Sequence, residues 1–388
     1  MKRRFIPVGQ GAFYHEQFDI NGQVVNVVYD CGSSTPGFDI EQEIKNRFQK
    51  GEEISIVFIS HLHTDHVNGL VYLLDHCKVK SVVFPLTYPE DKILLKIDCL
   101  CSSDASTMGE RVYELIENPS RYVSERYQGT YTYAVINAEE SNDYLNQNNR
   151  YREEVDAEHI LLSGENILEQ IRCDETRDKD ITSIRGVWEY VPFNFRDSSR
   201  RDTFYKALSA KMDAVIDETN IDWYLDQWND IIIQEKIIAA YENVNKDLNV
   251  NTMTLFSGTR DPYIRQRIRL SLNCFFPCKH FLCQNKENGC LYLGDYNAKG
   301  RIRWRDLRKC YDDYWNYIGC VQIPHHGSSY SYNHELALLD AFHIISAGKT
   351  NRYRHPHLSV IMDFLHEHKF PYIVTDDKTT EIILNIDF

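Results

Sequence analysis

The chain has 388 residues, a formal net charge of −14 at pH 7 and 43% hydrophobic residues, which is enough for a large folded core. The acidic charge argues against non-specific binding of long duplex DNA, because such binding needs a basic surface. The sequence has no run of roughly eighteen apolar residues and no signal-like start, so we expect no membrane contact. Its 11 cysteines, an odd number spread along the chain, predict reduced thiols and a cytoplasmic protein.

The N-terminal residues 1–33 predict a β-hairpin that leads into a buried strand. Asn21-Gly22 is a strong signal for a two-residue hairpin turn, and residues 23–29 form the next apolar run. Residues 38–51 predict a helix, because apolar residues recur on one helical face.

A dense cluster of candidate metal ligands follows the apolar strand predicted over residues 54–59. Alternation along an extended segment sends the first two imidazoles to the same side, and the last two residues lie where the chain turns into a helix. Histidine with aspartate suits zinc, manganese or iron. The alternative is a solvated turn, which does not need three histidines and an acid at this spacing. The four candidates are His61, His63, Asp65 and His66.

The middle of the chain, residues 87–247, is polar and rich in tyrosine. Its apolar periodicity predicts several helices, of which the strongest covers residues 221–244, and a strand is expected over residues 184–195. We interpret the region as a largely helical insertion that serves as a lid or binds a protein partner. It contains no motif that indicates chemistry.

The last part of the chain returns to alternating strands and helices. A strand over residues 289–294 ends at Asp295, whose carboxylate can bridge two cations. A basic run over residues 299–309 follows directly, and Arg301 within it is a candidate for contact with a phosphate. The alternative for such a run is an ordinary solvated helix face.

Two further histidine clusters each follow an apolar strand. In the first, His325 or His326 can bind a metal or protonate a leaving oxygen, and the Ser328 hydroxyl can donate to a phosphate. In the second, His355 or His357 can complete a metal site or polarise a phosphoryl oxygen. The alternative for one member of each pair is a core or hydrogen-bonding histidine. We assign His326 and His357 to catalysis together with Asp65, and His355 to the metal.

The motif His-x-His-x-Asp-His at residues 61–66 resembles the signature of the metallo-β-lactamase superfamily. This resemblance implies an α/β fold, an αββα sandwich of two facing mixed sheets flanked by helices. Residues 1–86 and 248–388 would form its two halves, with residues 87–247 inserted between them. It also implies that the first two histidines hold one metal and the Asp-His pair the second, while Asp30 orients the metal loop.

The order of the remaining motifs is similar to the hydrolase domain of DNA-uptake competence (ComEC-type) proteins and their stand-alone soluble relatives. The motifs are Gly-Gln-Gly, Asp-x-Gly, Leu-Gly-Asp, Pro-His-His-Gly-Ser and Arg-His-Pro-His. The chain departs from that pattern at Ala12, where an acid is usual, and at His63, where the competence domains usually have an acid. Asn251 stands in the stretch where other superfamily members place a further histidine.

Together these features predict a hydrolase with two divalent metal ions, Zn²⁺ or Mn²⁺. The leading hypothesis is a phosphodiesterase or nuclease that uses a metal-activated water on nucleic acid or a small nucleotide. The resemblance further implies a protein partner and a place in a bacterial defence or toxin system. The alternatives are a carbon-ester, lactone or thioester hydrolase and a non-catalytic metal-binding interaction protein.

Overall fold

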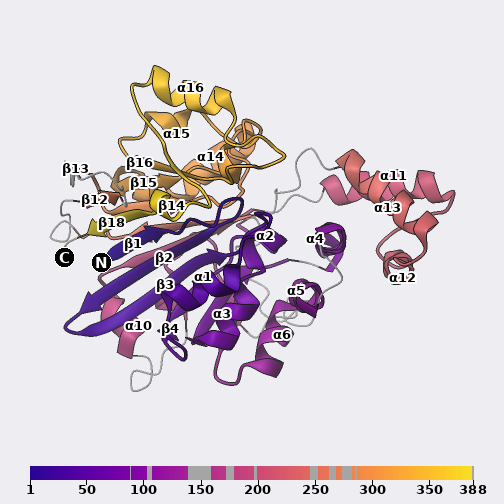
Figure 1. Cartoon of the computed structure of the whole chain (residues 1–388), viewed down its shortest axis with the longest axis horizontal. Coiled ribbons are helices and arrows are strands. Elements are labelled where there is room, and N and C mark those ends of the chain that lie inside the picture. Colours follow the sequence, from indigo (N-terminus) through magenta and orange to yellow (C-terminus); the bar gives the residue numbers. More distant parts are fainter. Residues whose placement is uncertain are drawn as a thin grey trace.

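The computed structural model describes residues 1–87, 89–102, 107–138, 159–171, 179–195, 199–244, 252–261, 268–272, 282–284 and 286–386. Within these ranges the strands form two large mixed sheets and one small pair (Figure 1). The first sheet has the order β13-β12-β18-β1-β2-β3-β5-β7-β8-β9, and the second has the order β10-β11-β14-β15-β16-β17.

The strands of the first sheet are antiparallel from β13 to β3 and parallel from β3 to β9. Their bounds are β1 Lys2–Phe5, β2 Phe13–Ile20, β3 Gln23–Cys31, β5 Ile56–Phe58, β7 Ser81–Pro85, β8 Tyr131–Val135, β9 His159–Leu161, β12 Ile268–Leu272, β13 Leu282–Gln284 and β18 Ile382–Ile386. The small pair consists of β4 Glu53–Ile54 and β6 Lys78–Val79.

The second sheet is antiparallel at β10 and β11 and parallel from β14 to β17. Its strands are β10 Glu189–Asn194, β11 Met253–Gly258, β14 Gly289–Tyr292, β15 Ile318–Gln322, β16 Phe342–Ser346 and β17 Tyr372–Val374. The parallel direction places the carboxyl ends of β14, β15 and β16 at one edge of the sheet.

Alternating side chains show that the two sheets face each other. Tyr29 of β3 and Tyr292 of β14 stack within one core cluster, with ring centroids 4.8 Å apart. Val28 points the other way, into the cluster that contains helices α1 and α3. Leu291 likewise points into a third cluster with helix α14. The order of layers is therefore helices, sheet, sheet, helices, as the αββα expectation requires.

Helices cover the outer faces of both sheets (Figure 1). The helices on the first half of the chain are α1 Ile40–Arg47, α2 Thr64–Val67, α3 Leu70–His76, α4 Pro89–Ser102, α5 Thr107–Glu117 and α6 Pro119–Arg126. Those later in the chain are α9 Ile167–Gln170, α10 Lys179–Ile184, α11 Ser199–Met212, α12 Ile221–Asp226, α13 Ile231–Val244, α14 Arg301–Cys310, α15 Glu335–Leu338 and α16 Leu358–His366.

Residues 87–247 contribute to both sheets as well as forming helices. Strands β8 and β9 extend the first sheet and β10 borders the second. Helices α4, α11, α12 and α13 share a separate hydrophobic cluster, and Figure 1 shows α11 to α13 standing away from the sheets. The largely helical insertion and the division into three domains therefore stay predictions.

Two predicted elements differ from the sequence-based expectation. The strand expected over residues 184–195 begins only at Glu189, because Lys179–Ile184 form α10. The helix expected over residues 221–244 is divided into α12 and α13. The Asp230 carboxylate accepts from the backbone N–H groups of Ile232 and Ile233, and so begins α13 as a new helix.

Candidate metal centre

The candidate ligands lie in loops that follow buried strands. His61 and His63 come after β5, and α2 begins immediately beyond them, so that Asp65 and His66 occupy its first turn. Asp295 follows β14, and His325 and His326 follow β15. The loop after β16 carries His355 and leads into α16. The fold therefore brings the loops after four strands to one place.

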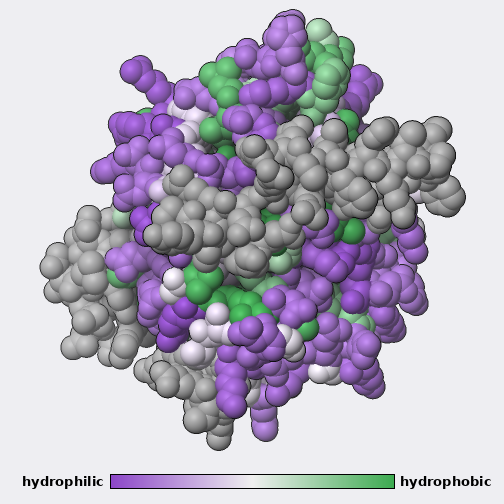
Figure 2. Space-filling model, turned by 90° about the vertical axis from the view of Figure 1, so that its left-hand side faces the viewer, coloured by the Kyte–Doolittle hydropathy of each residue, from purple (hydrophilic) through white to green (hydrophobic). Residues whose placement is uncertain are grey.

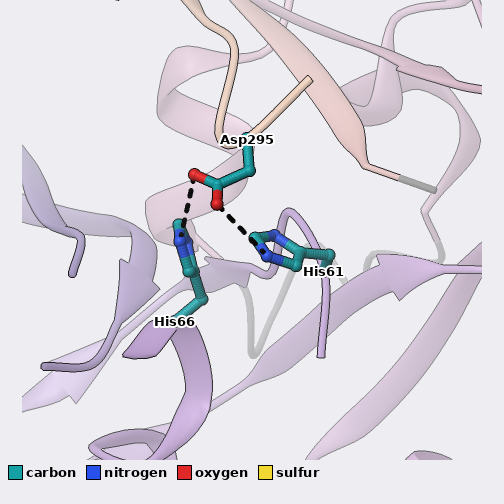
Figure 3. Close-up of side chains that lie close together, drawn as sticks. All are labelled: His61, His66 and Asp295. Carbon is teal, nitrogen blue, oxygen red and sulfur yellow. Dashed lines mark ion pairs between the residues drawn. The ribbon is translucent and has the colours of Figure 1, made fainter. Parts of the chain in front are cut away.

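Asp295 lies between two imidazoles from the other half of the chain (Figure 3). Its Oδ1 atom is 3.3 Å from Nε2 of His66, and its Oδ2 atom is 3.9 Å from Nε2 of His61. All three side chains are buried, and one ligand atom from each lies within 4.8 Å of the others. This spacing can hold one metal ion.

A second group shares His66 with the first. His326 Nε2 lies 3.4 Å from Asp65 Oδ2, and His66 Nε2 lies 3.9 Å from Asp65 Oδ1. The potential ligand atoms of Asp65, His66 and His326 again lie within 4.8 Å of one another. The two groups are adjacent, because His326 Nε2 is also 3.9 Å from Asp295 Oδ1.

Hydrogen bonds on the far side of two rings fix which nitrogen carries the proton. Asp30 Oδ2 accepts from His66 Nδ1 at 2.8 Å and from the Ser60 hydroxyl at 2.7 Å. Because the Ser60 hydroxyl has given its only hydrogen to Asp30, it accepts from His61 Nδ1 at 2.9 Å. Both imidazoles therefore carry hydrogen on Nδ1 and turn Nε2, the nitrogen that would bind a cation, toward Asp295.

His326 is fixed in the same way by the backbone. Its Nδ1 donates to the carbonyl of Ser346 at 2.9 Å. The buried Nε2 atoms of His61, His66 and His326 have no hydrogen-bond partner within the described part of the chain. Three such nitrogens beside the carboxylates of Asp65 and Asp295 fit a divalent cation.

The charges at this centre shift several pKa values strongly. Burial opposes charge on His66, but Asp295, Asp30 and Asp65 raise its pKa well above the usual value. Burial, followed by the neighbouring His66, lowers the pKa of His61 well below the usual value. Burial also works against ionised Asp295, but the surrounding histidines hold its pKa well below the usual range. The negative field that holds a proton on His66 also favours a cation in its place.

Three predicted residues surround these two groups without joining them. The ring centroid of His63 lies 4.7 Å from that of His61. The Nε2 atom of His325 lies 3.8 Å from Asp295 Oδ2. The ring centroid of His355 lies 5.3 Å from that of His325. Burial, together with the nearby imidazoles, lowers the pKa of His355 to about 3. Their roles as ligands stay predictions.

The remaining predicted residues lie next to the two ligand groups or outside the part of the chain that the structure describes. His357 Nδ1 accepts from the backbone N–H of Ser329 at 2.9 Å. Ser328 is buried, and its hydroxyl oxygen accepts from the backbone N–H of Tyr330. Arg301 is exposed at the first position of α14. Asn251 lies outside the described residues.

Sequence reasoning assigned no role to three residues that shape the centre. These are Ser60 and Ser346, described above, and Gln322, whose side-chain oxygen accepts from the backbone N–H groups of Leu293 and Gly294. Gln322 thereby fixes the turn that carries Asp295. The signal was a buried polar residue at the end of a strand, but a serine or glutamine there has many ordinary explanations.

The comparison with protein families matches only the first part of this centre. No curated protein matches the chain. The matched region includes Asp30 and the histidine motif, whereas Asp295 and the later histidines lie beyond it. Residues 22–95 carry a domain match to the metallo-beta-lactamase superfamily, which is typically composed of metal-dependent hydrolases.

Proposed function

We propose that the protein is a metal-dependent phosphodiesterase. The observation that carries the proposal is the convergence of three buried Nε2 atoms, from His61, His66 and His326, on the carboxylates of Asp65 and Asp295. Two divalent cations, Zn²⁺ or Mn²⁺, would be held by these five side chains. Bound cations supply Lewis acidity, which lowers the pKa of water toward about 7 and offsets the charge of a phosphodiester.

The protein's own groups can orient the substrate and move a proton. Since His357 Nδ1 accepts from the backbone, its neutral ring carries hydrogen on Nε2 and can donate there to a phosphoryl or leaving oxygen. Asp30 and Ser60 keep the metal-binding rings in one tautomer. The burial of His66 and Asp295 excludes bulk water from their charges.

Basic residues beside the centre support a phosphodiester over a neutral ester. Lys299 and Arg301 follow Asp295 closely in the chain and are exposed. Lys299 Nζ contacts the carbonyl of Ser329, the residue that holds His357. A lactone or thioester offers no phosphate for these cations to bind. The similarity of the motif order to competence-type hydrolase domains supports the same substrate class.

Purified protein with added Mn²⁺ or Zn²⁺ can be assayed on bis(p-nitrophenyl) phosphate and, in parallel, on a homoserine lactone. We expect metal-dependent hydrolysis of the phosphodiester, and a loss of at least about 100-fold in Asp295→Asn, which keeps the side-chain volume but removes the charge. Phe370→Ala is the control and should retain full activity, because Phe370 is an exposed residue just before β17. Hydrolysis of the lactone alone, or unchanged turnover in Asp295→Asn, would contradict the proposal.

The helical group formed by α4, α11, α12 and α13 is a candidate binding surface for the protein partner. Helix α4 packs against α2, the helix that carries Asp65 and His66. Trp223, Ile231 and Ile232 on the outer part of the group are exposed. We propose that a partner contacts this group, which packs through α4 against the helix that carries Asp65 and His66.

A further inference from the structure

Beside His357 the protein presents an exposed aromatic ring. Tyr330 is 62% exposed, and its ring centroid lies 5.9 Å from that of His357 with the planes almost perpendicular. The preceding residue, Ser329, holds His357 through both its backbone N–H and its hydroxyl. Tyr330 and the proposed proton donor are therefore anchored to the same short loop, while most of the tyrosine ring remains open to solvent.

Positive charge lies next to this ring. Lys299 Nζ donates to the carbonyl of Ser329 at 2.8 Å, which places the ammonium one residue away from Tyr330. Arg301 is exposed two positions further on, at the start of α14. In a chain with a net charge of −14, two exposed cations thus follow Asp295 within six positions of the sequence.

A second exposed tyrosine near the centre is arranged differently. The guanidinium of Arg352 lies 4.8 Å from the centroid of the Tyr353 ring, and the His355 ring stacks on Tyr353 with centroids 5.7 Å apart. Protein groups therefore occupy the ring of Tyr353, which supports His355. Of these two tyrosines, Tyr330 retains an open ring surface for a ligand.

We propose that Tyr330, Lys299 and Arg301 form a binding rim for single-stranded nucleic acid. One base stacks on the ring of Tyr330, and the neighbouring phosphates pair with the two cations. This inference rests on the proposed phosphodiesterase activity and specifies its substrate class. An unpaired base suits such a ring, because base–aromatic stacking needs a base that has left the helical stack.

The charge distribution favours a single strand over a duplex. The proposed rim contributes two cations, Lys299 and Arg301, and the chain has a net charge of −14, so the rim can neutralise a few phosphates but not a long double helix. A small nucleotide would meet the same ring but would not reach both cations along a backbone. The rim therefore selects a strand of several nucleotides.

Binding to a short labelled oligonucleotide, measured by fluorescence anisotropy, tests the rim independently of turnover. Single-stranded DNA, single-stranded RNA and duplex DNA of the same sequence are the three probes. We expect single strands to bind more tightly than duplex, and Tyr330→Ala to raise the Kd for single strands about tenfold. Tyr330→Phe, which keeps the ring, should bind nearly as well as the unchanged protein. The DNA and RNA probes show which sugar is preferred.

Two matched controls separate the rim from a general surface effect. Phe370→Ala removes another exposed aromatic ring, 75% exposed and located before β17, and should leave the Kd unchanged. Lys299→Ala should reduce the slope of log Kd against log salt by about one, whereas Lys309→Ala, at the other end of α14, should leave it unchanged.

An equal Kd for Tyr330→Ala and the unchanged protein, or equal binding of duplex and single strand, would overturn the rim. Failure of the unchanged protein to hydrolyse bis(p-nitrophenyl) phosphate would instead overturn the phosphodiesterase proposal. The two results are independent, since one measures binding and the other measures turnover.

Discussion

The Oδ2 atom of Asp30 lies 2.8 Å from Nδ1 of His66, whose opposite nitrogen lies 3.3 Å from Asp295. Asp30 adopts a left-handed backbone conformation, with φ of 54°, at the end of β3. For a non-glycine residue this conformation costs free energy, and it recurs at functional sites. Here it allows one carboxylate to hold both His66 and the Ser60 backbone.

Replacing Asp30 should weaken metal binding without removing a ligand. In Asp30→Asn the charge that stabilises the Nδ1 proton of His66 is lost, so we expect metal affinity to fall by about 10–100-fold. Competition with a chelating indicator measures this affinity. Asp19→Asn, at the exposed hairpin, is the matched control and should bind metal normally. Equal affinity in Asp30→Asn and the unchanged protein would show that Asp30 does not position His66.

The two histidines after β15 should differ in their effect on metal content. We expect His326→Ala to lose metal, because His326 belongs to a ligand group and its Nε2 has no hydrogen-bond partner among the described residues. His325→Ala should retain metal, because His325 lies outside both groups. Elemental analysis of the purified variants measures the difference. Loss of metal in His325→Ala with retention in His326→Ala would show that His325, and not His326, is the metal ligand.

Gly294 should be essential for bringing the two halves of the centre together. Its φ is +51°, and an added Cβ would lie 2.8 Å from Cβ of Ser60 and from Cγ2 of Thr252. We expect Gly294→Ala to lower the free energy of unfolding by about 1–3 kcal/mol and to reduce metal affinity, because Asp295 must move away from His61. Urea unfolding measures the first effect.

Gly37→Ala provides the matched control for Gly294→Ala. Gly37 also has a positive φ, of +75°, but no heavy atom lies within 4 Å of its added Cβ. It therefore carries the backbone strain without the steric clash. If Gly37→Ala destabilised the protein as much as Gly294→Ala, the close approach of Gly294 to Ser60 would have no special importance.

His343 should make stability depend on pH. Burial lowers its pKa to about 4, and its Nε2 donates to the carbonyl of Leu336 at 2.9 Å. Because the unfolded chain binds a proton more readily than the folded protein, stability is full above about pH 6.5 and is lost as pH falls toward 4.

The size of this effect can be measured by urea unfolding. The shift corresponds to a loss of about 3 kcal/mol at most between pH 6.5 and 4. We expect His343→Gln to be less stable at neutral pH but to show a smaller decrease on acidification. An unchanged pH slope in His343→Gln would exclude His343 as a source of the dependence.

Sequence predicted the parts of the fold that depend on local pattern. Asn21-Gly22 forms the turn between β2 and β3, where Ile20 pairs with Gln23. The buried strand before His61 was predicted correctly. The α/β class is confirmed as well, but the two facing sheets were implied by the resemblance to the metallo-β-lactamase superfamily and not by a local pattern. The membership of β8 to β10 in the sheets was missed, because short strands separated by long connections give little local signal.

Among the described residues no helix has both the length and the apolar character needed to cross a bilayer.

The surface and the exact geometry of the centre depend on tertiary contacts that no local pattern contains. In the face shown in Figure 2, hydrophilic residues predominate among the coloured atoms and hydrophobic residues gather in small areas.

At the centre, sequence could not choose between His325 and His326, because adjacent residues share every local property. Both have positive φ values, and the turn directs only His326 toward Asp65 and the Ser346 carbonyl.

The central claim is that segments far apart in the sequence form one metal centre. Anomalous X-ray diffraction from crystals grown with Mn²⁺ or Zn²⁺ locates such ions directly. We predict anomalous density among the Nε2 atoms of His61, His66 and His326 and the carboxylates of Asp65 and Asp295. If crystals grown with excess metal showed no anomalous density there, or showed density only at other residues, the account would be contradicted.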